Sequence, residues 1–155
     1  MATAGKYLTF YLGTGVCGLE ILKVQEIIGM MSVTRVPRTP DFVRGVINLR
    51  GKVIPVIELR TKFGLETHED DERTCIIVVQ VTRPDARVTM GLIVDEVSEV
   101  LYVEDGQIEP PPAFGALTNT EFLLGMGKVN GKVVMLLDVD RVLGGTEDAH
   151  WSVMS

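Results

Sequence analysis

The stretch that decides the fold runs over residues 42–64 and reads FVRGVINLRGKVIPVIELRTKFG. Its branched and apolar residues predict a strand up to Leu49, a tight turn at Arg50–Gly51 and a returning strand over residues 52–59. A helical turn should then end at Gly64, because glycine commonly stops a helix. The stretch is therefore interpreted as a β-hairpin with a short helical end.

The same pattern occurs a second time, in residues 122–144, which read FLLGMGKVNGKVVMLLDVDRVLG. The two copies align without a gap, and Glu58 then faces Asp138 at the end of the returning strand. The identical positions are Phe42 and Phe122, Gly45 and Gly125, Gly51 and Gly131, Lys52 and Lys132, Val53 and Val133, and Gly64 and Gly144.

A second pair of segments also matches, since residues 18–27 align with residues 91–100. The Gly-Leu start, Val24 with Val97, and Glu26 with Glu99 coincide. Each half of the chain thus carries one Gly-Leu segment followed by one hairpin. Two matches in the same order indicate an internal duplication, which favours an architecture of two similar units.

The composition is that of a folded protein with an acidic balance. The chain has 155 residues, 46% of them hydrophobic, and a formal net charge of −6. This charge argues against a nucleic-acid partner, which requires a basic face. No apolar run approaches the ~20 residues that cross a bilayer, and the first residues do not resemble a signal peptide. We therefore expect a cytoplasmic protein that is not inserted in a membrane.

Several segments between the duplicated ones can be assigned from their residues. Residues 6–12 predict a strand, residues 22–29 a short helical turn, and residues 31–37 a strand stopped by proline. The acidic run 66–73 predicts a solvated link between halves 6–65 and 74–145 of a single domain covering residues 1–155, and residues 146–155 a loose tail. About ten short strands in two sets of five suggest two small β-barrels packed together.

Residues 13–18 leave two interpretations open. They spell G-x-G-x-x-G after a predicted strand, which is the pattern of a dinucleotide-binding loop, so a nucleotide-dependent enzyme is the alternative function. The other interpretation is a hairpin turn at Gly13 to Gly15 followed by a strand. The turn is favoured because the chain shows hairpins rather than strands joined by long crossover helices.

No other arrangement of residues indicates catalysis or a cofactor. The two histidines, His68 and His150, have no cysteine at metal-ligand spacing, so no metal is expected. Cys17 and Cys75 are expected to be reduced thiols, since a disulfide is unusual in the cytosol. An apolar, strand-rich chain without a reactive centre is more typical of a binding module than of an enzyme.

The residues that carry a family resemblance are ILKVQEI at 21–27, VTRVP at 33–37, GVINLRG at 45–51, VIPVI at 53–57 and LRTKF at 59–63. Together they closely resemble the CheW family of bacterial chemotaxis coupling proteins, over residues 6–145. The resemblance implies an all-β fold of two five-stranded SH3-like barrels with few short helices. It also implies an adaptor without catalytic activity or cofactor.

The resemblance further implies two partners and a location. CheW proteins join the cytoplasmic tips of chemoreceptors to the regulatory domain of the histidine kinase CheA, in receptor arrays at the inner membrane. Receptor contacts carried over residue by residue fall at Val24, Glu26, Gly45, Asn48, Arg50 and Gly51. Family members contact the kinase through exposed ends of both barrels. We therefore choose Glu109 and Phe114 as candidate kinase contacts, followed by Val100, Leu101 and Tyr102.

Overall fold

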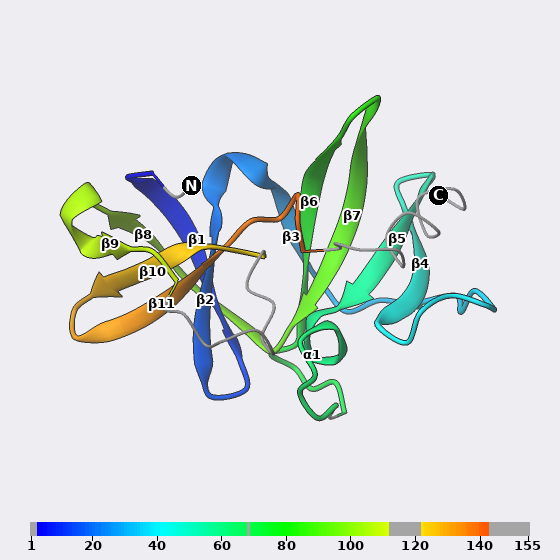
Figure 1. Cartoon of the computed structure of the whole chain (residues 1–155). Helices are drawn as coiled ribbons and strands as arrows, with labels where there is room; N and C mark the ends of the chain where they lie inside the picture. Colours follow the sequence, from blue (N-terminus) through cyan, green and yellow to red (C-terminus); the bar gives the residue numbers. More distant parts are fainter. Residues whose placement is uncertain (1–2, 68, 112–121, 143–155) are drawn as a thin grey trace.

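The computed structural model describes residues 3–67, 69–111 and 122–142, and within them the chain forms two β-sheets that lie beside each other (Figure 1). Sheet A contains, in spatial order, β8 (Glu96–Val103), β1 (Gly5–Leu12), β2 (Gly15–Glu20), β11 (Lys132–Leu137), β10 (Leu123–Val129) and β9 (Ile108–Glu109). Sheet B contains β3 (Val24–Gly29), β6 (Cys75–Arg83), β7 (Ala86–Val94), β5 (Lys52–Glu58) and β4 (Val43–Leu49). Short helices are η1 (Ile21–Lys23), α1 (Leu59–Lys62) and η2 (Asp105–Gln107).

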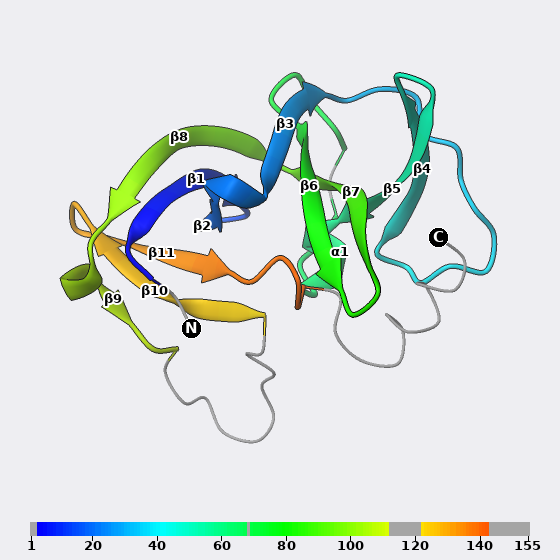
Figure 2. The same cartoon turned by 90° about the horizontal axis from the view of Figure 1, so that it is seen from above.

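Each sheet curls towards a barrel, as the view from above shows for the arch of β8 over sheet A (Figure 2). In that sheet β8 reaches β10, which lies four strands further along the order. The all-β prediction of two sheets with few short helices is confirmed. Sheet A differs from the expected five strands only by the two-residue β9, which pairs with β10.

The sequence duplication is visible in the strand order of the two sheets. The order β8-β1-β2-β11-β10 in sheet A has the counterpart β3-β6-β7-β5-β4 in sheet B. The parallel contacts match residue for residue, because Leu136 lies opposite Gly18 in one sheet and Val56 lies opposite Gly91 in the other. Both hairpins also close with the same backbone bond, at 2.7 Å from Glu58 N to Phe42 O and 2.8 Å from Asp138 N to Phe122 O.

The sheets exchange strands between the two halves of the chain. Sheet A takes β1 and β2 from the first half and its other strands from the second, and sheet B does the converse. The chain crosses between sheets in the two Gly-Leu segments, once from β2 to β3 and once from β7 to β8. Halves 6–65 and 74–145 are thus copies of the repeat and do not coincide with the sheets. The acidic run 66–73 joins β5 to β6 inside sheet B.

Three apolar cores follow from the alternation of side chains along the strands. On β6, Val78 packs inside barrel B while its neighbour Val79 packs into a central core between the sheets. Phe10 and Leu19 of sheet A and Leu92 of sheet B are fully buried in this central core. Separating the sheets would expose many such side chains, each worth about 1.5–3 kcal/mol, whereas a whole domain is stable by only about 5–15 kcal/mol. The two sheets therefore form one folding unit.

Two expectations for local structure were wrong. The predicted helical turn over residues 22–29 is shorter, since only residues 21–23 are helical. Val24–Gly29 forms strand β3 because it pairs with β6 along its length. In residues 31–37, pairing is limited to a single bridge between Thr34 and Val46, since Pro37 and the surrounding polar residues do not extend it. A partner strand decided the first case, and residue preferences alone do not reveal it.

The alternative of a dinucleotide loop is contradicted by the geometry of residues 13–18. Gly13 lies in the tight turn between β1 and β2, with a positive φ of 64°, and residues 15–20 form strand β2. No helix N-terminus therefore follows the glycines, and a phosphate group would lack the backbone N–H groups that such a loop provides.

Candidate interaction surfaces

The turn of the β4–β5 hairpin has the geometry that its counterpart predicts, although its sequence is less suited to it. Arg50 and Gly51 have φ values of 52° and 86°, and Asn130 and Gly131 in the second hairpin have 52° and 78°. Positive φ at both central residues is the signature of a type I′ turn, which prefers Asn-Gly. An arginine in this conformation carries a steric cost. The first hairpin therefore adopts the same turn with a residue that the conformation alone does not favour.

Two of the receptor candidates are joined directly. The Arg50 guanidinium, through Nη2, forms an ion pair with Oε2 of Glu26 on β3, at the far edge of sheet B from β4. The side chain of Arg50 is 66% exposed and that of Glu26 is 26% exposed. The pair spans the open end of the barrel between its two edge strands. An exposed pair of this kind contributes little to stability, so its main consequence is to hold a guanidinium and a carboxylate at the rim.

The remaining receptor candidates occupy two different environments. Asn48 and Gly51 are exposed at the same tip, where Asn48 Oδ1 accepts a hydrogen bond of 2.8 Å from Gly51 N. Val24 is half-buried at the edge of the central core. Gly45 is buried, and a Cβ placed there would lie 2.2 Å from the carbonyl oxygen of Thr34. Sheet B thus carries all six candidates, but the fold itself requires a glycine at position 45.

The kinase candidates that the structure describes lie on sheet A. Glu109 on β9 pairs with Lys128 on β10 at 2.7 Å, and both side chains are more than half exposed. On the edge strand β8, Val100 and Tyr102 are exposed, whereas Leu101 between them packs against the core of barrel A. Phe114 lies outside the described residues.

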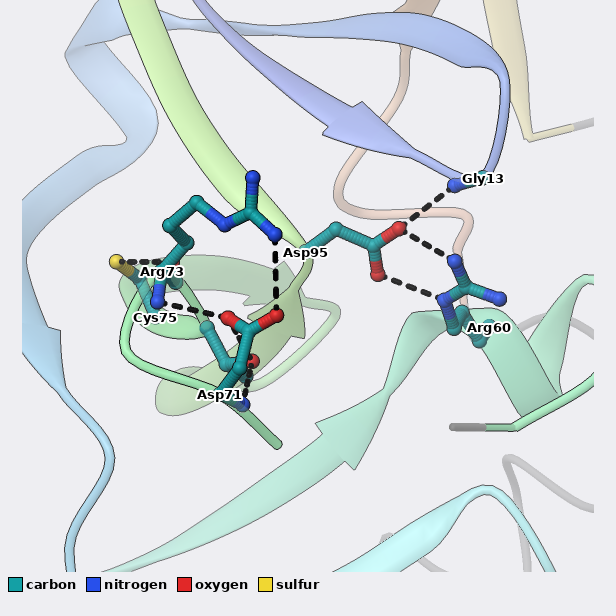
Figure 3. A network of polar contacts seen from close by, with 7 residues as sticks. Gly13, Arg60, Asp71, Arg73, Cys75 and Asp95 are labelled. Atoms are coloured by element: carbon teal, nitrogen blue, oxygen red, sulfur yellow. Dashed lines mark hydrogen bonds and ion pairs between the residues drawn. The ribbon is translucent and has the colours of Figure 1, made fainter. Parts of the chain in front are cut away.

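One polar cluster that the sequence did not indicate connects the two sheets (Figure 3). Asp95, between β7 and β8, accepts hydrogen bonds from Arg60 Nε at 2.7 Å and Nη2 at 2.6 Å. The Oδ2 oxygen that binds Nη2 also accepts a hydrogen bond from Gly13 N at 2.8 Å, so Asp95 holds α1 and the β1–β2 turn together. Both charged side chains are only 18% exposed, and the hydrogen bonds to Asp95 raise the pKa of Arg60. Burial with two well-aligned bonds makes this a strong contact.

A second inter-sheet contact occupies the corresponding place with its charges reversed. Asp140, the counterpart of Arg60 in the repeat, pairs with Lys23 at 3.0 Å. Its other oxygen accepts a hydrogen bond of 2.7 Å from Thr82 N, in the turn region of the β6–β7 hairpin. In each contact one carboxylate binds a cation and a backbone N–H of a hairpin end. The signal that could have located both contacts is the alignment of Arg60 with Asp140.

The described residues offer no cluster of side chains typical of a metal site. They contain no group of three or more histidine, cysteine, aspartate or glutamate side chains that could hold a metal ion. Cys17 is buried and Cys75 is half-buried, and both are free thiols. Burial raises the pKa of the Cys17 thiol to about 12, with a smaller contribution from the Asp95 carboxylate. A thiol with so high a pKa stays protonated and is a poor nucleophile.

None of the helices in the part of the chain that the structure describes has the length and apolar character required to span a bilayer.

Comparison with known proteins gives consistent results across sequence and structure. The family model described as "CheW-like domain" matches residues 6–147. The chain is 41% identical to the chemotaxis protein CheW of Klebsiella aerogenes over 93% of this chain and 84% of the relative. It is 35% identical to CheW of Rhizobium meliloti over 95% and 97% of the two chains.

A solved structure agrees with these relatives. The crystal structure of the scaffolding protein TtCheW from Thermoanaerobacter tengcongensis superposes with a TM-score of 0.82 at 34% identity, over 94% of this chain and 96% of that one. Two duplicated barrels, the extent of the family match and this structural likeness all lead to one assignment. The chain belongs to the CheW-like family of chemotaxis scaffold proteins.

Proposed function

We propose that this protein is a non-enzymatic adaptor that couples the cytoplasmic tips of chemoreceptors to the histidine kinase CheA. The observation that supports it best is the separation of the two candidate surfaces. The receptor candidates lie on sheet B, and the described kinase candidates lie on sheet A. Two surfaces on two barrels of one rigid unit let a single chain bind two partners at once. The receptors would then recruit the protein from the cytoplasm to arrays at the inner membrane.

On the receptor side, the tip of a chemoreceptor is a helical hairpin. A tip that presents carboxylates or exposed helix carbonyl groups would be a suitable partner for a cationic rim. The guanidinium of Arg50 offers five donors and a permanent charge at the exposed rim of barrel B. Val24 adds an apolar contact where β3 meets the central core. Helix docking on an apolar surface with a charged rim is a common mode of recognition.

On the kinase side, the partner is the regulatory domain of CheA, which the family resemblance gives the same double-barrel fold. Tyr102 is 58% exposed and Val100 is 48% exposed on the edge strand β8, and the Glu109–Lys128 ion pair lies on β9 and β10 at the other edge in the strand order of the same sheet. Exposed aromatic and branched residues with a polar rim are typical of protein interfaces. We expect barrel A to pair with a barrel of the kinase.

The test is a reconstitution with three components. Purified kinase should sediment with receptor-bearing membranes when this protein is added and stay in the supernatant when it is omitted. Membranes without receptors serve as the control. If the kinase sediments equally with and without the protein, the adaptor function is wrong.

A further inference from the structure

A row of polar side chains crosses the open end of barrel B, on four adjacent strands. Gln80 Nε2 on β6 donates to Gln25 Oε1 on β3 at 2.6 Å and to Thr89 Oγ1 on β7 at 2.8 Å. Lys52 Nζ on β5 donates to the same Thr89 oxygen at 3.3 Å. We call these four residues the polar row. Gln80 shares a strand face with Val78, so the row lies directly above the apolar core of the barrel.

The repeat provides an internal comparison for this row. Gln80 lies opposite Thr89 two residues beyond the pair Val78–Gly91, and in sheet A the pair two residues beyond Thr9–Gly18 is Tyr11–Val16. At these two places sheet A therefore has a tyrosine and a valine instead of the glutamine and threonine that build the row. Because the strands and their register are shared, the fold alone does not require a polar row. Barrel B carries it in addition to the common framework.

The same end of barrel B is basic, in a chain whose net charge is −6. The ladder between β6 and β7 continues to Arg83 opposite Ala86, whereas β1 and β2 end at Leu12 opposite Gly15. The longer hairpin extends towards the same end of the barrel as the tip of β4–β5, since β5 and β7 are parallel (Figure 1). The two tips together with Glu26 bring four basic and two acidic side chains to this end: Arg50, Lys52, Arg83, Arg87, Glu26 and Asp85.

The corresponding end of barrel A has no such excess of basic residues. Its β1–β2 turn consists of Gly13 and Thr14, and its β10–β11 turn of Asn130 and Gly131. Lys132 is present in the place of Lys52, and Lys128 is paired with Glu109. Local charge of one sign attracts a partner of the opposite sign and orients it during approach.

We propose that this end of barrel B recognises an acidic end of a helical hairpin, with Lys52 and Arg87 as contacts. The other three residues of the polar row hold Lys52 in place. The proposal rests on the receptor-binding function given above and extends it to residues to which no role was assigned. A helix C-terminus presents carbonyl groups and the negative end of the helix dipole. Lys52, Arg50 and Gln25 present donors within one rim, so the chemistry of the two sides is complementary.

The test compares charge reversals at matched positions. Lys52→Glu and Arg87→Glu should each weaken co-sedimentation with receptor-bearing membranes by about tenfold or more, because like charges then face each other. Lys132→Glu changes the same residue type at the equivalent place of the other hairpin, and it should leave receptor binding within about twofold. Binding of the unaltered protein should weaken as NaCl is raised from low to physiological concentration. Thermal melts of all variants establish that they are folded.

The outcomes separate this proposal from the function on which it rests. If the unaltered protein does not sediment with receptor membranes at any salt concentration, the adaptor function fails. If it sediments and Lys52→Glu behaves like Lys132→Glu, only the proposal for the end of barrel B is overturned. Binding that does not change with salt would also overturn it.

Discussion

Arg50 occupies a left-handed backbone conformation that disfavours arginine. Its φ of 52° matches that of Asn130, whose side chain tolerates this region at lower cost. We predict that Arg50→Asn leaves the free energy of unfolding unchanged or raises it by up to about 1 kcal/mol, since relief of the turn offsets the lost exposed ion pair. Receptor co-sedimentation should nevertheless fall sharply. A variant that loses stability and keeps receptor binding would make Arg50 a structural residue.

The glycine at position 45, unlike Arg50, is explained by packing within the fold alone. A Cβ at this position would lie 2.2 Å from the carbonyl oxygen of Thr34, at a backbone φ of 151° that side chains rarely adopt. We predict that Gly45→Ala lowers the free energy of unfolding by about 2–4 kcal/mol in urea denaturation. Gly29→Ala is the control, since a Cβ there meets nothing within 4 Å. Equal effects of the two changes would contradict this assignment.

Cys17 gives a prediction about pH. Burial raises the pKa of its thiol from 9.0 to about 12, so the folded chain holds this proton more tightly than the unfolded chain. The stabilisation is complete below pH 9 and is lost as the pH rises towards 12, by about 1.4 kcal/mol for each pH unit above 9. Urea denaturation of the protein and of Cys17→Ala between pH 8 and about 11 measures the difference. Parallel pH profiles would show that this thiol does not contribute.

At the scale of elements, the two inter-sheet contacts determine how the crossovers attach to the sheets. Asp95→Ala removes the partner of Arg60 and the acceptor for Gly13 N, whereas Asp95→Asn keeps an acceptor. We expect the alanine variant to lose about 2 kcal/mol or more in thermal or urea melts, and the asparagine variant about half of that. Asp140 is 29% exposed, so the same pair of changes there should cost less. A loss below about 0.5 kcal/mol for Asp95→Ala would mean that the contact behaves as an exposed ion pair.

Much of the element structure could be predicted because the chain contains its own second copy. Both hairpins and their turns followed from the alignment of residues 42–64 with 122–144. The segment from Val24 to Gly29 could not be assigned in this way, since its strand character comes from pairing with β6. Of the candidate site, the sequence indicated Glu26 and Arg50 as separate residues, and the structure joins them in an ion pair. The contact of Asp95 with Arg60 was missed because only the strand exchange brings them together.

At the scale of the molecule, the exchange of strands explains why two small barrels form one unit. Each half of the chain provides strands to both sheets, and the central core contains buried side chains from both. Neither sheet can be completed by one copy of the repeat. The two candidate surfaces are therefore carried by a common framework, while their chemistry differs because the copies have diverged at the barrel ends.

We propose that one chain binds receptors through barrel B and the kinase through barrel A. It is tested most directly by measuring both bindings, receptor co-sedimentation and CheA pull-down, for Arg50→Asp and for Tyr102→Asp. Both side chains are more than half exposed, so both variants should melt like the unaltered protein. We predict that Arg50→Asp loses receptor binding and keeps the kinase, and that Tyr102→Asp does the reverse. Two folded variants that lose both partners together, or neither, would contradict it.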